Sequence, residues 1–509
     1  MSSAERPGGP THGRRPNIIW VFPDQMRAQA MSCAGDPNVH TPNLDALAKS
    51  GVRFANACSN YPVCVPARFT LLTGERASSR WVPTIHWRMS PAERTVAHEL
   101  GEAGYATSYI GKWHLYGGDA PADAYRRIPV PRRHQGGFER WQGFEFRNDP
   151  FDTHYFANDD PEPHRIEGYQ TDGLFDLALA ELDRLAADER PFFLALSVEP
   201  PHPPYQGPRF GENSRAMAPH LVDRIELRPN VDVERFVAEK PWLLANWRRR
   251  RAQLTGAGKR DAGLASVGAA GSTAAAFTDR QVLQALLLEY GQSVENVDAN
   301  MGRLVHALRH KGLWEDTIIL FFADHGELLG SHGTQGKQLP YQESVGIPFI
   351  VAGGRVPGER LVTAPVSIED IFPTTLDLAG VDPAPHLPGA SLAPLLAADG
   401  AQEPSGRSAG GADGGGAAFS RDAVFLEYVE EHRDSHKSIP PWRAIRTERY
   451  CYSITGEGPW MLFDLHEDPY EQKNLIADPA TAEDRRELHE RLMGHLAAIE
   501  DPFARTYQP

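Results

Sequence analysis

A cysteine, a proline and an arginine at alternate positions suggest chemistry first: Cys64, Pro66 and Arg68. Pro66 has a fixed φ angle that suits a first helical turn, so the sequence predicts a short helix over residues 66–73 with Cys64 at its N-terminus. The N–H groups there favour an anion, and the guanidinium of Arg68 adds a bidentate donor. An unmodified cysteine in that position would be a low-pKa thiolate. The competing interpretation is a buried structural cysteine, which is how we interpret Cys33, Cys58 and Cys451.

More polar side chains follow four apolar runs that predict buried strands, at residues 17–22, 106–110, 192–198 and 317–322. The residues that follow them are Asp24 and Gln25, then Lys112 and His114, then His202 between prolines, then Asp324 and His325, with Lys337 in the loop beyond. In an open α/β sheet, ligands bind outside the carboxyl ends of the strands. These side chains are therefore expected to share one crevice.

Hard oxygen donors dominate this set. Asp24, the Gln25 carbonyl and Asp324 offer oxygen, and His325 can add a nitrogen, which suits Ca²⁺, Mg²⁺ or Mn²⁺ better than a structural zinc ion. Taken alone, the Asp324-His325 pair is more often a turn with a capping aspartate, and a lone histidine is more often a satisfied polar residue. Histidines at three different strand ends do not fit that simpler reading. Lys112 and His114, two apart on an extended segment, can face one cleft.

Helical patterns alternate with the strands, which predicts an α/β fold with a large, mainly parallel sheet sandwiched by helices. The helices are expected at 41–50, 91–103, 172–187, 280–311 and 368–379, with a fifth strand at 347–351. We expect a disordered tail at 1–14, a catalytic domain at 15–398 with an insertion at 206–277, and a flexible linker at 399–418. Residues 419–509 predict a smaller α+β C-terminal domain, with strands at 423–428, 442–446, 450–454 and 460–464 and a helix at 480–499.

Composition limits the classes of partner. The chain has 509 residues and a formal net charge of −15, which argues against nucleic acid or an anionic membrane as the main partner. Positive charge for any anion site must therefore be local. Four cysteines are too few for a disulfide framework, and the N-terminus lacks the apolar core of a signal peptide, so we expect a cytoplasmic protein. The arginine run at 248–251 is expected to be a solvated helix face. The sequence leaves a homo-oligomer open.

Together these motifs resemble the formylglycine-dependent sulfatases, relatives of the alkaline phosphatases, and within them the arylsulfatase and choline-sulfatase branch. The resemblance covers nearly the whole chain, through residues 16–19, 24–25, 41–45, 64–74, 111–114, the proline-rich loop around His202, 324–333, Lys337, 443–446 and 464–469. It implies that a formylglycine-generating enzyme oxidises Cys64 to formylglycine, whose hydrate is the nucleophile. It also implies that position 64, Asp24, Gln25, Asp324 and His325 bind one divalent metal ion, with calcium expected first and magnesium or manganese as alternatives.

The resemblance also implies a role for each remaining site residue. Arg68 and Lys112 would hold the hydrate and the sulfate, and His202 and Lys337 would bind the ester and help the leaving oxygen depart. One hydroxyl of the hydrate would attack sulfur in line, and the alcohol would leave. His114 would then take the proton of the second hydroxyl, which expels sulfate and restores the aldehyde.

Two positions depart from the commoner family pattern, because many sulfatases have a second aspartate where Gln25 stands and an asparagine where His325 stands. The implied function is that of a sulfuric ester hydrolase acting on a small-molecule sulfate ester. One alternative is a phosphonate monoester hydrolase or phosphodiesterase with the same formylglycine site. The presence of Lys112 and His114 favours a sulfatase over this alternative. Another is an inactive binding relative with an unconverted Cys64. The sequence does not identify the ester. We expect the loops at 148–154, 206–277 and 428–441 to contact its leaving group and to determine substrate specificity.

Overall fold

The computed structural model describes residues 15–117, 128–209, 222–255, 277–397, 419, 421–430, 432–433 and 438–506. The tail predicted at 1–14 and the linker predicted at 399–418 lie outside the described residues, as do 210–221 and 256–276 of the predicted insertion. Within these ranges, no helix combines the length and the apolar character that a membrane crossing requires.

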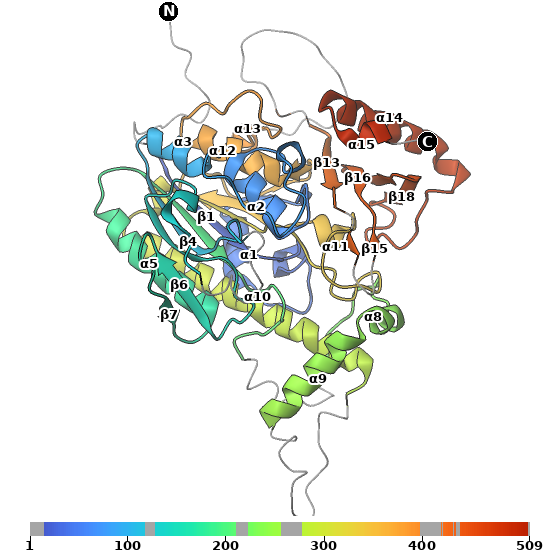
Figure 1. The fold of residues 1–509 in the computed structure, drawn as a ribbon, viewed down its shortest axis with the longest axis horizontal. Helices are drawn as coiled ribbons and strands as arrows, with labels where there is room; N and C mark the ends of the chain where they lie inside the picture. Colours follow the sequence, from blue (N-terminus) through green and yellow to red (C-terminus); the bar gives the residue numbers. More distant parts are fainter. Residues whose placement is uncertain are drawn as a thin grey trace, which may run out of the picture.

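A large sheet lies at the centre of the molecule (Figure 1). Its ten strands follow the order β11-β2-β10-β9-β1-β8-β4-β5-β6-β7. Its four middle strands run parallel: β9 (Thr317–Phe322), β1 (Asn17–Pro23), β8 (Phe192–Val198) and β4 (Ala106–Lys112). Every residue of β1, β4 and β8 is buried, as expected for strands covered on both faces. Parallel strands bring their carboxyl ends to one edge of the sheet, which confirms the α/β prediction and fixes where a site can form.

The outer strands are mixed in direction. Strand β10 (Phe349–Gly353) pairs antiparallel with β9 and with β2 (Gly51–Phe54), and β11 (Arg360–Val362) pairs parallel with β2. At the other edge, β5 (Arg140–Phe144), β6 (Thr153–Ala157) and β7 (His164–Ile166) end the sheet with two antiparallel pairs. The sequence analysis found β10 but not these edge strands, because they are short and carry polar, partly exposed residues in place of an apolar run.

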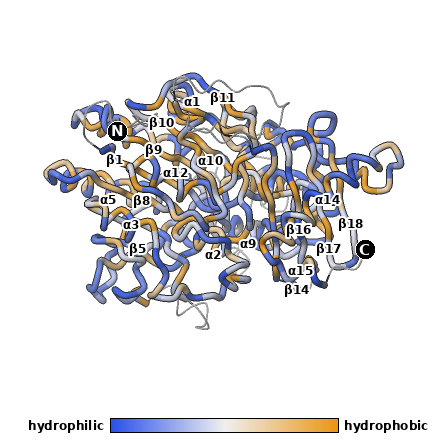
Figure 2. The backbone as a smooth tube through the Cα atoms, turned by 90° about the horizontal axis from the view of Figure 1, so that it is seen from above, coloured by the Kyte–Doolittle hydropathy of each residue, from blue (hydrophilic) through white to orange (hydrophobic). Residues whose placement is uncertain are grey.

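Helices cover both faces of the sheet (Figure 1). On one face α5 (Gln170–Ala186) packs against the long helix α10 (Asp279–His310), and α1 (Pro42–Lys49) packs beside α10. On the other face α2 (Cys64–Thr73), α3 (Val96–Glu102) and α12 (Ile371–Leu378) contact one another. Figure 2 shows the hydrophobic residues gathered along the central strands between these layers.

Local caps explain where three helices begin and end. Helix α2 starts at Cys64 itself, two residues before the predicted start, and ends at Thr73, where Gly74 caps it with a φ of 72° that suits glycine. Helix α3 starts five residues later than predicted, because Thr95 and His98 form a capping box. Helix α10 begins after Thr278, which caps it together with Gln281.

The four strands and the helix that the sequence predicts for the C-terminal part are present, and the strands form an antiparallel sheet on which the helix packs. Its strands are β13 (Ala423–Tyr428), β16 (Trp442–Thr447), β17 (Tyr450–Thr455) and β18 (Gly458–Asp464), and α14 (Ala482–Ala498) follows. One face, with Leu426 and Trp442, joins the core of the large sheet, and the other, with Ile445 and Ile454, packs on α14. Both views show these elements beside the main sheet (Figures 1 and 2).

The arginine run of the predicted insertion lies in α9 (Pro241–Thr255), which follows α8 (Val233–Glu239). Its expected role as a solvated helix face is wrong for Arg251, which is buried with its guanidinium 4.7 Å from the ring centre of Phe277 and 5.5 Å from that of Trp247. Arg248 forms an ion pair with Asp279 at 2.6 Å. Two of the four arginines therefore fasten α9 to the main body.

Candidate active site

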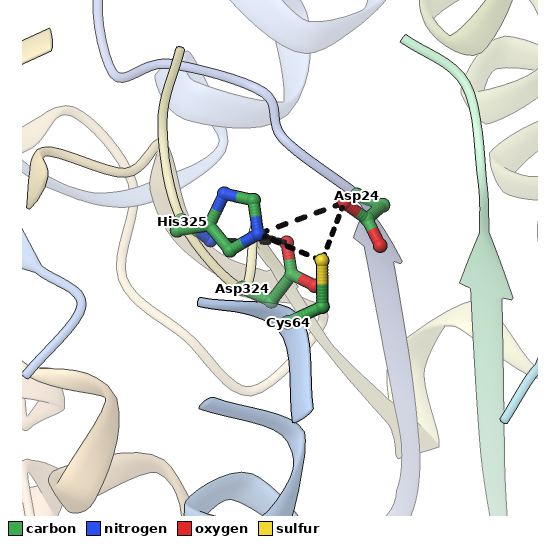
Figure 3. Close-up of side chains that lie close together, drawn as sticks. All are labelled: Asp24, Cys64, Asp324 and His325. Carbon is green, nitrogen blue, oxygen red and sulfur yellow. Dashed lines mark hydrogen bonds and ion pairs between the residues drawn. The ribbon is translucent and has the colours of Figure 1, made fainter. Parts of the chain in front are cut away.

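Four predicted metal ligands converge at the carboxyl edge of the sheet (Figure 3). Asp24 follows β1, Cys64 is the first residue of α2, and Asp324 and His325 follow β9. Cys64 Sγ lies 3.1 Å from His325 Nε2 and 3.6 Å from Asp24 Oδ1. His325 Nε2 lies 3.7 Å from Oδ1 of both aspartates. All four side chains are buried, and their donor atoms lie within 4.8 Å of one another.

The two aspartates divide their oxygens between protein cations and this cluster. Oδ2 of Asp24 contacts Lys112 Nζ at 2.7 Å and Arg68 at 3.1 Å, and Oδ2 of Asp324 contacts Arg68 at 3.0 Å. Oδ1 of each aspartate remains toward the cluster. The ring of His325 pairs Nδ1 with the Gly326 carbonyl at 3.0 Å, which leaves Nε2 as the atom facing the aspartates. Two carboxylate oxygens, one imidazole nitrogen and the side chain at position 64 fit a divalent cation of the calcium, magnesium or manganese kind.

Gln25 lies at the edge of this cluster with a left-handed backbone, at φ 67°. Its backbone N–H donates to Asp324 Oδ1 at 3.0 Å, and its side-chain Nε2 donates to Glu327. The amide oxygen therefore faces Lys337, whose Nζ donates to it at 2.5 Å and lies 3.4 Å from Cys64 Sγ. Glu327, which the sequence analysis cited only as part of a motif, thus orients the Gln25 amide.

Arg68 and Lys112 form the positive side of the site, and both are buried. Arg68 donates to the Lys112 carbonyl at 2.9 Å and to Ser197 Oγ at 2.8 Å, and Lys112 Nζ lies 3.4 Å from Glu199 Oε1. Burial alone would raise the pKa of Asp24, but the charges of Lys112 and Arg68 are among those that hold it well below its usual value. The sequence analysis missed Ser197 and Glu199, since nothing in a single buried strand marks the residues that will touch Arg68 and Lys112.

The two predicted proton carriers also reach the site. His114 has φ 56°, so the extended segment that was expected to carry it ends at Lys112. The ring centres of His114 and Phe146 lie 5.0 Å apart, and among the described residues its buried Nδ1 has no hydrogen-bond partner. His202 follows a cis Pro200–Pro201 bond and pairs Nδ1 with the Pro203 carbonyl at 2.8 Å.

Burial, and after it the charge of Lys112, lower the pKa of His114 and of His202 well below the ordinary histidine value. Both imidazoles are therefore neutral near pH 7, which lets each accept a proton. The expected low-pKa thiolate is wrong for unmodified Cys64. Burial and the nearby Asp24 carboxylate raise the pKa of that thiol to about 11.

Comparisons with known proteins agree with this geometry. The Sulfatase family matches residues 16–381, and a family described as N-sulphoglucosamine sulphohydrolase, C-terminal, matches residues 330–497. The chain is 30% identical to the ulvan-active sulfatase of Formosa agariphila, over 99% of this chain and 84% of that protein. The solved structure of BT4656 with its substrate D-glucosamine-2-N,6-O-disulfate is similar with a TM-score of 0.74 and 25% identity, over 96% of this chain and 99% of the other.

A phosphonate monoester hydrolase from Silicibacter pomeroyi shares the fold, with a TM-score of 0.68 and 22% identity over 96% of each chain. The family match covers most of the chain, and the 30% identity extends over nearly all of it. This chain therefore belongs to the sulfatase family, the hydrolases of sulfate esters.

Proposed function

We propose that this sulfatase releases inorganic sulfate from a sulfate monoester by means of a formylglycine hydrate at position 64 and one divalent metal ion. The observation that supports this proposal is the convergence of Asp24, Asp324 and His325 on the side chain at position 64. A buried thiol with a pKa of about 11 is a poor nucleophile at neutral pH. The hydrate of an aldehyde brings two hydroxyls to the same place. A bound metal ion, calcium by preference and otherwise magnesium or manganese, would polarise oxygen and favour its ionised form there.

The basic side chains would hold the ester. Arg68 and Lys112, fixed by buried carboxylates, provide positive charge in a low-dielectric site where it acts strongly on the transferring sulfate. One hydroxyl at position 64 forms a bond to sulfur while the bond from sulfur to the alcohol oxygen breaks. Lys337, whose ammonium lies 3.4 Å from Cys64 Sγ, would give a proton to that oxygen, and His202 would bind the ester beside it.

His114 would complete the cycle. Its neutral imidazole can take the proton of the remaining hydroxyl at position 64, after which the carbon–oxygen bond to sulfate breaks and the aldehyde forms again. The proposal needs a formylglycine-generating enzyme as a maturation partner, and we place the reaction in the cytoplasm. Phosphonate ester hydrolysis is the alternative, and the pair Lys112 and His114 favours the sulfate ester.

The mass of the tryptic peptide over residues 54–68 tests the nucleophile, with protein made in a host that has the formylglycine-generating enzyme. The peptide contains Cys58 and Cys64, so alkylation counts the thiols while the mass reports an aldehyde. We expect one alkylated thiol and one aldehyde, at position 64. Two alkylated thiols in a preparation that still releases sulfate would refute the proposal. Parallel assays with sulfate and phosphonate esters of 4-nitrophenol then separate the two activities.

Replacement of His114 by alanine tests the second half of the reaction. Because the first half does not need its imidazole, we expect a burst of released alcohol and sulfate trapped covalently at position 64, seen by intact-protein mass. His306→Ala, at an exposed position of α10, is the control and should turn over normally. A burst without a covalent adduct would contradict the role of His114.

A further inference from the structure

A cavity of about 220 Å³ lies apart from the active site, beside the end of β2. Its walls come from three segments: residues 28–34 after β1, residues 53–55 at the end of β2, and residues 342–348 before β10. In the sheet order, β10 and β9 separate β2 from β1, which places β2 roughly 14 Å from β1 at the usual strand spacing. None of the side chains assigned to the ester or to the metal lines this cavity.

The walls of the cavity are mainly apolar. Met31, Phe54 and Ile347 are each at most 2% exposed, and Pro348 and three alanines complete the apolar lining. The volume admits a single ring or a short branched chain, since a cavity of about 150 Å³ is enough for benzene. Walls of this kind favour a ligand with a small apolar body.

Arg53 supplies the one charge among the residues that line the cavity. Its side chain is partly buried, and within the described part of the chain its guanidinium has no hydrogen bond or ion pair. Cys33 lies between the lining residues Met31 and Ala34. Burial and the charge of Asp45 raise the pKa of the Cys33 thiol to about 11, and the charge of Arg53 opposes this shift. The positive charge of Arg53 therefore acts on the wall formed by residues 28–34.

Two arginines that are buried to a similar degree have carboxylate partners. Arg228 pairs with Glu343 at 3.0 Å, and Arg355 pairs with Asp316 at 2.5 Å. A partly buried guanidinium without such a partner keeps its N–H donors for an anion from outside the chain. Arg53 is therefore suited to bind a ligand.

Asp45 acts on the same thiol as Arg53 but has other partners. Its Oδ1 accepts from the Cys33 N–H at 3.0 Å and from the Thr41 hydroxyl at 3.2 Å, and it forms no ion pair with Arg53. An anion that enters the cavity would therefore meet Arg53 without displacing a protein carboxylate.

We propose that this cavity is a second anion-binding site, and that it binds a small organic carboxylate whose apolar body is about the size of one ring. The guanidinium of Arg53 would donate two parallel hydrogen bonds to the carboxylate, because its fork matches the geometry of that group. The apolar body would lie against Met31, Phe54 and Ile347. Inorganic sulfate would meet the charge but leave these walls uncovered. The inference does not depend on the proposed function, since it uses no residue of the active site.

Fluorine NMR of 4-fluorobenzoate, titrated with the full-length protein, measures this binding. The matched probe is 4-fluorobenzamide, which has the same ring and no charge. We expect the benzamide to bind the wild type at least about tenfold more weakly, because hydrogen bonds to charged groups contribute more than neutral ones. Equal affinities for the two probes, or no binding of 4-fluorobenzoate, would overturn the inference.

Replacement of Arg53 tests the charge. Arg53→Met removes the guanidinium and keeps an apolar stem, so the affinity for 4-fluorobenzoate should fall at least about tenfold, while the affinity for 4-fluorobenzamide changes little. Arg53→Lys is the matched control, because it keeps the charge but not the fork, and its loss should be smaller. Far-UV circular dichroism checks that each variant is folded.

Ala34→Leu tests the apolar walls and leaves Arg53 in place. The larger side chain would fill part of the cavity, so both probes should bind at least about tenfold more weakly. Binding of 4-fluorobenzoate to the active-site cations, Arg68 and Lys112, would be unchanged in Arg53→Met and in Ala34→Leu, and that result would overturn the inference. Full displacement of 4-fluorobenzoate by an equal concentration of inorganic sulfate would also overturn it, since charge alone would then be recognised.

Discussion

Two clusters of histidine and carboxylate side chains stand out among the described residues, all buried except the partly buried His332, and by composition either could hold a metal ion. The first, at the carboxyl edge of the sheet, contains Asp24, Cys64, Asp324 and His325. The second contains His332, Glu343 and Glu471, where the loop after β9, the short helix α11 (Gln342–Val345) and the C-terminal part meet. The clusters differ in what the protein has left for a cation to bind.

In the second cluster, protein donors occupy three of the four carboxylate oxygens, and His332 Nε2 lies 3.1 Å from Asn230 Nδ2. Oε1 of Glu343 accepts from Arg228 Nε at 3.0 Å and from Asn230 Nδ2 at 2.8 Å, and Oε2 lies 3.5 Å from His332 Nε2. In the first cluster, Oδ2 of each aspartate is held by protein cations, and Asp324 Oδ1 accepts from two backbone N–H groups at 3.0 Å. Asp24 Oδ1, Cys64 Sγ and His325 Nε2 face one another without such donors between them.

Glu471 completes the second cluster in the same way. Its Oε1 pairs with Arg446 NH1 at 3.3 Å, and its Oε2 accepts from the Gln342 N–H at 2.6 Å. For both acids, burial raises the pKa of the carboxyl group, and neighbouring positive charges and hydrogen bonds lower it. The pKa of Glu343 falls to about 2, whereas burial raises the pKa of Glu471. We conclude that the second cluster joins segments of the fold, and that a list of ligand-type residues does not by itself identify a metal site.

The largest effect should come from Cys64→Ala. Without the precursor of the nucleophile, sulfate release should fall by at least about four orders of magnitude, while the far-UV circular dichroism spectrum stays unchanged. Initial rates with 4-nitrophenyl sulfate measure the loss. Residual turnover close to the wild-type rate would mean that another residue attacks sulfur.

Asp324→Asn should show, through the metal content of the protein, that the first cluster binds the ion. It removes a negative charge from the first cluster and leaves Arg68 without one carboxylate partner, so metal affinity should fall at least about tenfold to a hundredfold, and activity with it. Elemental analysis after dialysis against a metal buffer measures this change. Full occupancy in the variant would remove Asp324 from the ligand set.

Glu343→Gln should affect stability and leave metal content unchanged. It leaves Arg228 and His332 without their buried anion, so the free energy of unfolding should fall by about 3 kcal/mol. Urea denaturation with parallel elemental analysis tests both parts. A loss of metal in this variant would show that the second cluster also holds an ion.

The stabilising effect of Glu343 on the folded protein should depend on pH. The folded-state pKa of Glu343 is below its unfolded value, so its stabilising contribution is present above about pH 4.5 and is lost as pH falls through about 2. The stability difference between wild type and Glu343→Gln should therefore shrink across that window. A difference that stays constant down to pH 2 would contradict the ionic role.

The smallest effect is expected from Glu327→Gln. Glu327 accepts from Gln25 Nε2 and from the Gly336 N–H at 2.7 Å, so a neutral amide there should misorient Gln25 and lower kcat/KM about tenfold. Adding Gln25→Glu exchanges carboxylate and amide and should restore part of the loss. No recovery in the double variant would show that Glu327 acts through the loop alone.

The sequence predicted the centre of the fold well, because β1, β8 and β9 are dominated by large apolar residues, β4 carries Tyr109 and Ile110 in a β-type run, and the site residues lie at or beyond their ends. It could not predict contacts made only by the tertiary fold, such as those of Glu199 with Lys112 or of Glu327 with Gln25. The raised pKa of Cys64 was hidden for the same reason, since a helix N-terminus is visible in the sequence and burial is not.

The conversion of Cys64, the metal, the roles of the site residues, the domain boundaries and the cytoplasmic location stay predictions. These properties depend on a chemical modification, a bound ion, a substrate or a cellular partner, which the contacts within the chain do not identify. The mass of the peptide over residues 54–68, the metal content of Asp324→Asn and the kinetics of His114→Ala address the first three in turn.

The small C-terminal sheet has one consequence for how the molecule can be handled. Leu426 and Trp442 on one face belong to the same core as the central strands, and Ile445 and Ile454 on the other face are covered by α14. A shortened protein that ends before residue 419 would uncover a large apolar surface of the main body, which favours aggregation. The main body and the C-terminal part should therefore unfold together in a single cooperative thermal transition. Expression should use the full-length chain.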